Sequence, residues 1–175
     1  MKLDCASEVK IIRAYFVLLS ACANFVPKIF LTNAMIENVL KASKEFGVRF
    51  SEVDSMNIAW HGSYALYFED AREEFGRVFG LSYQLFRNEG YPAPLVELNF
   101  KFIKPLLHGQ RARVDITYRN SPAAKIVFNY EIHLVEDNSL VTTGTSTQVF
   151  IDRELNLMWT NPSFYEEWKK RYNLL

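Results

Sequence analysis

The chain has 175 residues, of which 49% are hydrophobic and 15% aromatic, and its 20 basic residues balance 20 acidic ones. This length suits one domain with its own core, and the apolar content is too high for a disordered protein. The formal charge of zero leaves no basic surplus for nucleic acid or for an anionic membrane surface, so we expect neither partner.

The first 34 residues differ from the rest, and we treat 1–34 as an N-terminal extension of a domain over 35–175. A short apolar run that ends at Cys22 resembles a secretory or lipoprotein signal. Against this, Asp4 and Glu8 interrupt the basic start that such a signal has, and the apolar run is too short to span a bilayer. A docked amphipathic helix, or a true start at Met35, explains the same residues. We therefore expect a cytoplasmic protein without a membrane span, or a lipoprotein or exported protein if residues 1–22 act as a signal.

Both cysteines lie in this extension, which excludes a disulfide framework and a thiolate metal site in the folded part. The histidines His61, His108 and His133 are scattered and lack the spacing of a zinc-binding helix. We expect neither a metal nor a cofactor.

The domain begins with a predicted short helical segment and then a strand at about 46–52. Residues 61–79 follow with apolar side chains every three to four positions, which predicts an amphipathic helix that Gly80 ends. Glu73 and Arg77 lie off the apolar stripe and are spaced as an ion pair. The stripe consists of Tyr64, Phe68, Ala71, Phe75 and Phe79.

From residue 95 the apolar spacing changes to every second residue, which predicts four strands with one buried face each. Short connections predict that successive strands are antiparallel neighbours, because a parallel crossover needs a dozen residues or more. The C-terminal residues 161–172 predict a closing helix with Asn161 as its cap and Pro162 in its first turn. The four strand segments are 96–103, 111–118, 125–134 and 140–152.

One sheet with one apolar face must cover one helix with one apolar stripe. The economical solution is an α+β domain in which a curved antiparallel sheet wraps around a long central helix.

The segment EVDSMNIAWHGSYALYFEDAR, residues 52–72, carries most of the chemistry-bearing side chains. Asp54 precedes the predicted helix, where a carboxylate commonly closes a turn. His61 stands at the helix start and suits a packing or capping role as well as a chemical one. Glu69 lies beside the apolar stripe, where a salt bridge with Arg72 is the simpler interpretation. From the residues alone, both interpretations stay open for each side chain.

A strand, this motif and an amphipathic helix together resemble the hotdog-fold acyl-CoA thioesterases of the 4-hydroxybenzoyl-CoA thioesterase type. The resemblance covers about residues 46–153 in element order. Relatives often have glycine where Asn57 stands and asparagine where Ser63 stands. Asparagine tolerates a positive φ, and serine caps helices well, so neither departure removes a proposed catalytic group. The motif consists of Asp54, Asn57, Ile58, Ala59, Trp60, His61 and Tyr64, followed by Glu69, Ala71 and Arg72.

The resemblance implies metal-free hydrolysis of a thioester, carried by CoA or by acyl carrier protein, in a homodimer or homotetramer. Asp54 is then the general base or the nucleophile in a site between two subunits. The backbone N–H of His61 would polarise the thioester carbonyl, and its imidazole would orient water or protonate the departing thiolate. Glu69 is a second candidate base, because some hotdog subfamilies place the carboxylate on the helix.

Trp60 and Tyr64 are substrate-contact candidates within the motif, although Tyr64 also suits the core. The resemblance places contacts to the CoA phosphates near the hairpin that holds Arg119, Ser121 and Lys125, whose cations and hydroxyl suit phosphate. Two alternative functions stay open. One is a non-catalytic hotdog protein that binds acyl thioesters, and the other is a 3-hydroxyacyl thioester dehydratase.

Overall fold

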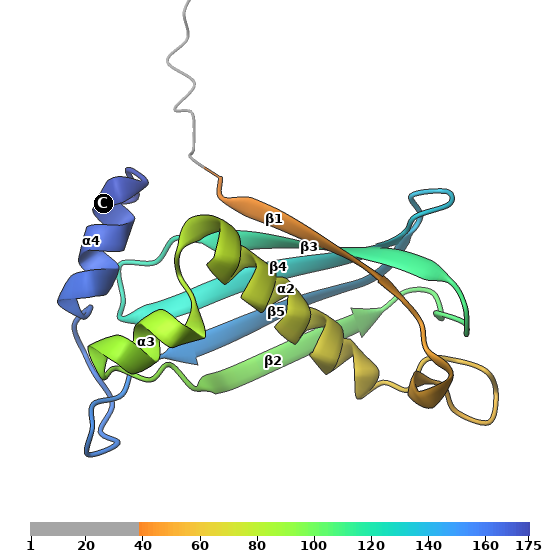
Figure 1. Ribbon diagram of the computed structural model, residues 1–175, viewed down its shortest axis with the longest axis horizontal. Helices are drawn as coiled ribbons and strands as arrows, with labels where there is room; N and C mark the ends of the chain where they lie inside the picture. The colour runs from red at the N-terminus through yellow and green to blue at the C-terminus, as the bar shows by residue number, and fades with distance from the viewer. Residues whose placement is uncertain (1–38) are drawn as a thin grey trace, which may run out of the picture. The chain divides into compact units, whose positions relative to one another are not determined.

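The computed structural model describes residues 39–175, so the predictions for residues 1–34 lie outside the described part. The strands are β1 (Lys41–Gly47), β2 (Leu95–Phe102), β3 (Arg111–Arg119), β4 (Lys125–Leu134) and β5 (Leu140–Val149). The helices are the 3-10 turn η1 (Phe50–Glu52), α2 (Ser63–Phe79), α3 (Tyr83–Glu89) and α4 (Ser163–Arg171). All strand pairs are antiparallel, and α2 crosses one face of the sheet (Figure 1). This arrangement confirms the predicted α+β hotdog fold.

The strand order is β1-β3-β4-β5-β2, which corrects one prediction about the connections. The segment between β2 and β3 does not join neighbours, because β2 pairs with β5 and β3 pairs with β1 and β4. Residues 103–110 instead cross the end of the sheet from one edge toward the other. Their shortness suggested a hairpin, but a short segment also suffices to pass across two intervening strands.

The first strand lies earlier than predicted. We expected a strand at about 46–52, whereas β1 ends at Gly47, which pairs with Arg111, and residues 50–52 form the 3-10 turn. The predicted helical segment is also wrong over the described residues, since 41–47 are extended. Ala42 is the one fully buried residue of β1, so this polar edge strand lacks the apolar alternation by which strands are recognised.

The helix α2 buries the predicted stripe against the sheet. Tyr64, Phe68, Ala71 and Phe75 are buried, and Phe79 packs partly buried against them. The Phe68 ring stacks on Tyr130 of β4 with a centroid distance of 4.0 Å and an interplanar angle of 7°. The helix starts at Ser63, two residues later than predicted, and Gly80 ends it with a φ of 74°, as expected.

Gly144 of β5 lies directly beneath this contact. A Cβ atom at this position would lie 2.4 Å from Phe68 Cε2 and 2.6 Å from the carbonyl oxygen of Asn99. Real side chains do not tolerate such distances, so the close approach of α2 to the sheet requires glycine here.

Two short helices complete the domain at the end where β3 and β4 are connected (Figure 1). The sequence did not predict α3. The closing helix α4 was predicted correctly, but Asn161 does not cap it. Pro162 takes the cap position, and no side chain of the described residues caps the helix. Asn161 Oδ1 is buried without a hydrogen-bond partner there. The indole of Trp168 donates to the Phe79 carbonyl at 2.8 Å and fixes α4 to the end of α2.

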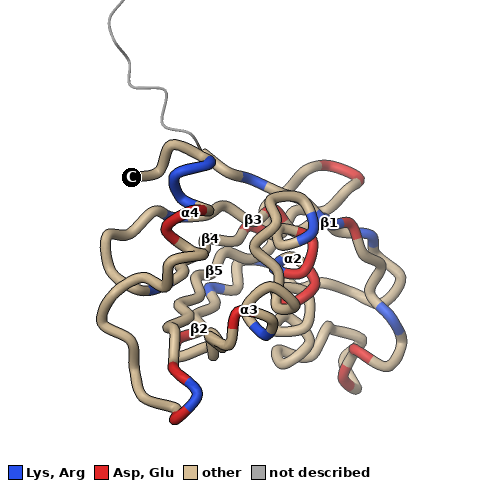
Figure 2. The backbone as a smooth tube through the Cα atoms, turned by 60° about the vertical axis from the view of Figure 1, so that its left-hand side comes forward, with Lys and Arg blue, Asp and Glu red and all other residues tan. Residues whose placement is uncertain are grey.

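Acidic and basic positions are interspersed along residues 39–175, with a short acidic run on α2 (Figure 2). The predicted pair of Glu73 with Arg77 is wrong, because Arg77 Nη2 lies 2.5 Å from Glu74 Oε1. Residues three apart on a helix face each other as well as residues four apart. Within the described chain, none of the helices combines the length and apolar character of a membrane-spanning segment.

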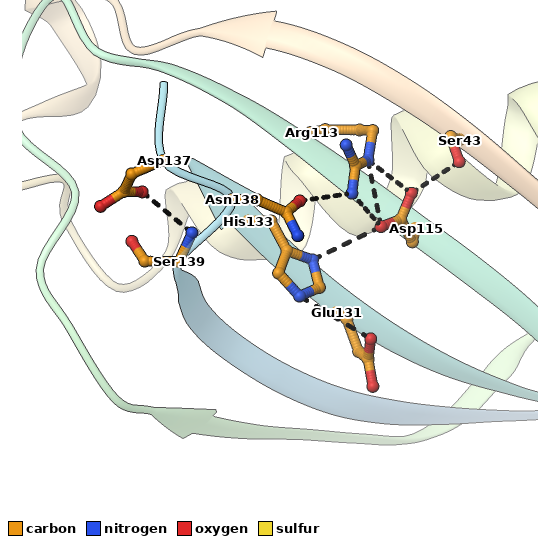
Figure 3. A network of polar contacts seen from close by, with 8 residues as sticks. All are labelled: Ser43, Arg113, Asp115, Glu131, His133, Asp137, Asn138 and Ser139. Carbon is orange, nitrogen blue, oxygen red and sulfur yellow. Dashed lines mark hydrogen bonds and ion pairs between the residues drawn. The ribbon is translucent and has the colours of Figure 1, made fainter. Parts of the chain in front are cut away.

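The outer face of the sheet, away from α2, carries a polar network near the β4–β5 connection (Figure 3). Asp115 accepts from Ser43 Oγ at 2.6 Å and from Arg113 Nε at 2.8 Å. His133 Nδ1 lies 3.4 Å from the same carboxylate, and His133 Nε2 lies 3.9 Å from Glu131. Burial acts to raise the pKa of Asp115, but the hydrogen bonds outweigh it, so the pKa lies below its ordinary value.

We expect Asp115→Asn to weaken the domain at neutral pH but much less at pH 3. A carboxyl group with a depressed pKa stabilises the fold above its unfolded pKa, and this contribution is lost as the pH falls through the folded pKa. Solvent screening limits the effect to about 1 kcal/mol or less. Urea unfolding at pH 6 and pH 3 measures it, with Asp70→Asn on the exposed face of α2 as the control. An equal difference between parent and variant at both pH values would contradict this assignment.

Candidate active site

The loop that precedes α2 is closed by Asp54. The carboxylate oxygen Oδ1 of Asp54 accepts from the N–H of Met56 at 2.8 Å and from that of Ile58 at 3.3 Å. The Asp54 N–H donates to the Ile58 carbonyl at 2.8 Å. Asn57 has a φ of 62°, which confirms that asparagine can replace glycine in this turn. Asp54 therefore serves the turn with one carboxylate oxygen, and no backbone N–H of the described residues bonds to the other.

This loop is tied to the segment that crosses the end of the sheet. The Ala59 N–H donates to the Leu106 carbonyl at 2.8 Å, and Ile58 and Leu107 form an isolated antiparallel bridge. The Trp60 N–H donates to the Glu52 carbonyl at 2.8 Å. These bonds fix the Asp54 turn relative to the first turn of α2.

Not every backbone N–H group just before α2 forms a backbone hydrogen bond within residues 39–175. Gly62 takes the cap position of the helix. A Cβ atom on Gly62 would lie 2.1 Å from the Trp60 ring, so the ring occupies the space that a side chain at position 62 would need. Ser63 does not cap the helix, although serine suits that role, because its hydroxyl donates to the Glu52 carbonyl at 3.2 Å. Among residues 39–175, no backbone acceptor bonds to the His61 N–H. This donor adds to the positive end of the helix dipole.

Asp54 and His61 line one cavity of about 400 Å³. Tyr64 is buried beneath it and meets the Phe102 ring edge-on, with a centroid distance of 4.9 Å. Burial raises the pKa of the Tyr64 hydroxyl, so it is neutral at neutral pH. The apolar walls are Ile58, Ala59, Phe102, Ile103 and Pro105, and the polar groups belong to Asp54, His61, Tyr64 and Lys104. A carboxylate, an imidazole and apolar walls thus line a space whose size suits a small organic ligand.

Two other predicted residues of the motif lie outside this cavity. Trp60 is 55% exposed and packs beside His61 with a centroid distance of 5.0 Å. Glu69 lies more than one helical turn beyond Tyr64 and forms an ion pair with Arg72, as the simpler interpretation predicted. Arg72 in turn donates to the Tyr83 hydroxyl at 2.9 Å.

The predicted phosphate-binding hairpin lies at the opposite end of the sheet. The strand β3 begins beside the Asp54 end, where Arg111 pairs with Gly47, and runs nine residues to Arg119. At about 3.3 Å per residue, this separates the hairpin from Asp54 by more than about 20 Å within one chain. Ser121 accepts from the Ala123 N–H at 3.2 Å, and Lys125 opens β4.

Sequence reasoning missed the wall formed by residues 102–105. The N–H groups of Ile103 and Lys104 both donate to the Val141 carbonyl, at 2.8 and 3.0 Å, and this turns the chain beneath the helix start. The proline after a strand was a local sign of a turn. Nothing local indicated that this turn meets Asp54.

No group of three His, Cys, Asp or Glu side chains within residues 39–175 has the arrangement of a metal site. The groups that line the cavity and can act chemically are the Asp54 carboxylate, the His61 imidazole and the Lys104 ammonium group.

Comparisons with known proteins agree with this fold. The profile of the thioesterase-like superfamily matches residues 48–168. The chain is 29% identical over 113 residues to "Putative acyl-CoA thioesterase YneP" of Bacillus subtilis (strain 168), covering 65% of this chain and 81% of that protein. The DHNA-CoA thioesterase from Staphylococcus aureus matches with a TM-score of 0.69 and 25% identity, over 76% of this chain and 91% of that one. A 4-hydroxybenzoyl CoA thioesterase mutant complexed with 4-hydroxybenzoyl CoA is similar in fold, with a TM-score of 0.65 and 16% identity, over 74% of this chain and 98% of that one.

The superfamily match and the similarity to acyl-CoA thioesterases confirm the predicted class of enzyme, a thioester hydrolase. The chain belongs to the thioesterase-like superfamily.

Proposed function

We propose that this protein hydrolyses an acyl-CoA thioester to the free acid and CoA, without a metal or other cofactor. The observation that carries the proposal is that Asp54 and His61 line the same partly apolar cavity, while no backbone acceptor within residues 39–175 bonds to the His61 N–H. The similarity to an acyl-CoA thioesterase and to a solved DHNA-CoA thioesterase supports CoA as the carrier.

Thioester hydrolysis needs an activated nucleophile and stabilisation of the negative charge that develops on the carbonyl oxygen. A preorganised N–H donor contributes roughly 10²-fold or more to the rate. A positioned base adds about 10²–10⁴-fold. Asp54 supplies the base, and the His61 N–H supplies the donor at the positive end of α2.

In the base mechanism, the Asp54 carboxylate takes a proton from water as the hydroxide oxygen bonds to the carbonyl carbon. The oxyanion of the tetrahedral intermediate is stabilised by the His61 N–H. When the carbonyl re-forms, the carbon–sulfur bond breaks and the thiolate leaves, and the proton reaches it from Asp54 or from the His61 imidazole. In the nucleophile mechanism, a carboxylate oxygen of Asp54 attacks the carbonyl carbon and the carbon–sulfur bond breaks, so that the CoA thiolate leaves and a mixed anhydride remains. Water then cleaves the anhydride to the free acid and regenerates Asp54.

The test is hydrolysis by the purified protein across short, long and aromatic acyl-CoA substrates, with release of free thiol as the measurement. The same acyl groups on acyl carrier protein test the carrier. Tight binding of acyl-CoA without turnover across this panel would replace the proposal with a non-catalytic binding role. Hydration of an enoyl-CoA would indicate a dehydratase.

A homodimer formed along β2 is part of this proposal. Within the described sheet β2 pairs with β5 alone, so its other edge is open. Leu95, Val96 and Phe102 expose apolar surface along it. Open apolar edges are sites where strands of a second chain pair. Because β2 ends at the cavity wall, a partner on this edge would lie beside the candidate site.

We expect the parent protein to sediment at twice the 20.4 kDa chain mass or more, and Val96→Lys to shift it toward the monomer. A lysine on an open strand edge opposes pairing because its charge would be buried. Val135→Lys is the matched control, since Val135 is an exposed valine at the β4–β5 connection. If both variants keep the parent's mass, the β2 edge is not the interface.

A further inference from the structure

A second cavity, of about 560 Å³, lies at the other end of β2 from the candidate active site. Its apolar lining includes Phe86 of α3, Pro92 and Pro94 ahead of β2, and Ile151 and Leu155 after β5. The active-site cavity is lined by residues 102–105 instead. Eight residues of strand separate the two cavities, which is about 25 Å within one chain.

Two guanidinium groups line this mostly apolar space. Arg87 lies on α3, and Arg153 lies against Gly90, where a Cβ atom would be 3.1 Å from Arg153 Nε. Among residues 39–175, neither arginine forms an ion pair. The carboxylate of Asp152, which also lines the cavity, accepts instead from two backbone N–H groups and from the side chain of Asn156.

The loop after β5 holds its cavity-lining side chains in place. Ile151 and Leu157 form an isolated antiparallel bridge, and Asp152 Oδ1 accepts from the N–H groups of Glu154 and Asn156 at 2.9 and 2.8 Å. Leu155 has a φ of 66° and is 75% exposed. A leucine in the left-handed region is unfavourable by roughly 1 kcal/mol or more, and its exposure adds nothing to the core. The loop therefore presents Leu155 to the cavity at a cost to the fold.

We propose that this second cavity binds an amphiphilic anion, whose apolar chain or ring packs on Phe86, Pro92, Ile151 and Leu155. Its carboxylate or phosphate head is held by Arg87 and Arg153. Guanidinium groups suit both heads, because their paired N–H donors match two oxygens of one anion. A volume of this size suits a small organic ligand. The site is independent of the proposed hydrolysis, because it contains neither Asp54 nor the start of α2.

The test is calorimetric binding of decanoate and of decyl phosphate to the full chain, with decanol and CoA as comparison ligands. We expect at least one of the two anions to bind, and decanol to bind about tenfold more weakly or worse. The double variant Arg87→Gln/Arg153→Gln should weaken the anion by about tenfold or more. Leu155→Asn should also weaken it while keeping the loop, because asparagine tolerates the left-handed region. Lys170→Gln, an exposed change on α4, is the control and should bind as the parent does.

Three results would overturn the proposal. Decanol binding as tightly as the anions would remove the role of the arginines. Unchanged binding by both cavity variants would place the ligand elsewhere, such as in the Asp54 cavity. If CoA, which has no acyl chain, displaces the anion, then the arginines bind phosphate groups and the apolar lining does not contribute to binding.

Discussion

Replacing Asp54 with asparagine is expected to lower kcat for acyl-CoA hydrolysis by about 10²–10⁴-fold, with a small change in KM. The substitution separates chemistry from structure. Asparagine keeps an oxygen that can accept from the N–H groups of Met56 and Ile58, as Asp54 Oδ1 does. The turn survives, and what is lost is the negative charge that takes the proton or attacks the carbonyl. Steady-state kinetics on the best substrate of the panel gives the measurement.

Two further variants sharpen this prediction. Asp70→Asn neutralises an exposed carboxylate on α2 and should leave kcat unchanged. Asp54→Ala also removes the acceptor that closes the turn, so it should lower both kcat and the free energy of unfolding. If Asp54→Asn hydrolyses as fast as the parent, another group is the base and the proposed mechanism is wrong.

Truncation of Phe68 to alanine is expected to lower the free energy of unfolding by about 3–5 kcal/mol. Phe68 is fully buried, stacks on Tyr130 at 4.0 Å and lies 4.9 Å from the ring of Phe100. Removing the ring leaves a cavity between α2 and three strands that cannot collapse, because backbone hydrogen bonds hold those strands in place. Urea unfolding followed by circular dichroism gives the value.

The matched control is Val78→Ala on the same helix, where the side chain is 48% exposed. We expect a change of less than about 1 kcal/mol, because an exposed valine contributes little and alanine favours the helix. Similar losses for the two variants would mean that Phe68 does not anchor α2 to the sheet.

Much of the fold was predictable because the apolar spacing in α2, β3 and β4 reports directly on burial. In β3 and β4 every second residue faces α2, and these residues are buried in the structure. β1 was misplaced because an edge strand with one buried residue carries no such pattern. The short helix α3 was missed for the same reason, since Phe86 is its one buried residue.

Neither Ser63 nor Asn161 caps a helix, although both residue types suit that role. The Ser63 hydroxyl bonds to the carbonyl of Glu52, eleven residues away, instead of to its own helix. Asn161 offers a side chain suited to capping, but Pro162 takes that position. For Ser63 a tertiary contact selects another arrangement, whereas Asn161 Oδ1 is buried without a hydrogen-bond partner among residues 39–175.

The candidate site was predictable where its residues share one segment of chain. Asp54 and His61 are seven residues apart and line the same cavity. Lys104 comes from a distant segment, and its place depends on the crossing from β2 to β3 that the short connection concealed. The sequence contains no local pattern that shows at which end of the sheet the hairpin with Arg119 lies.

Gly144 has a consequence for the size of the substrate that enters. Phe68 rests on this glycine, and Tyr64 lies one turn earlier on the same helix, at the bottom of the Asp54 cavity. Tyr64 meets Phe102 at 4.9 Å, so the distance between helix and sheet also sets the depth of that cavity. A methyl group at position 144 would meet both the Phe68 ring and the Asn99 carbonyl, so the helix and the neighbouring strand would both have to move. The space for a substrate in the proposed site therefore depends on a residue that does not line the cavity.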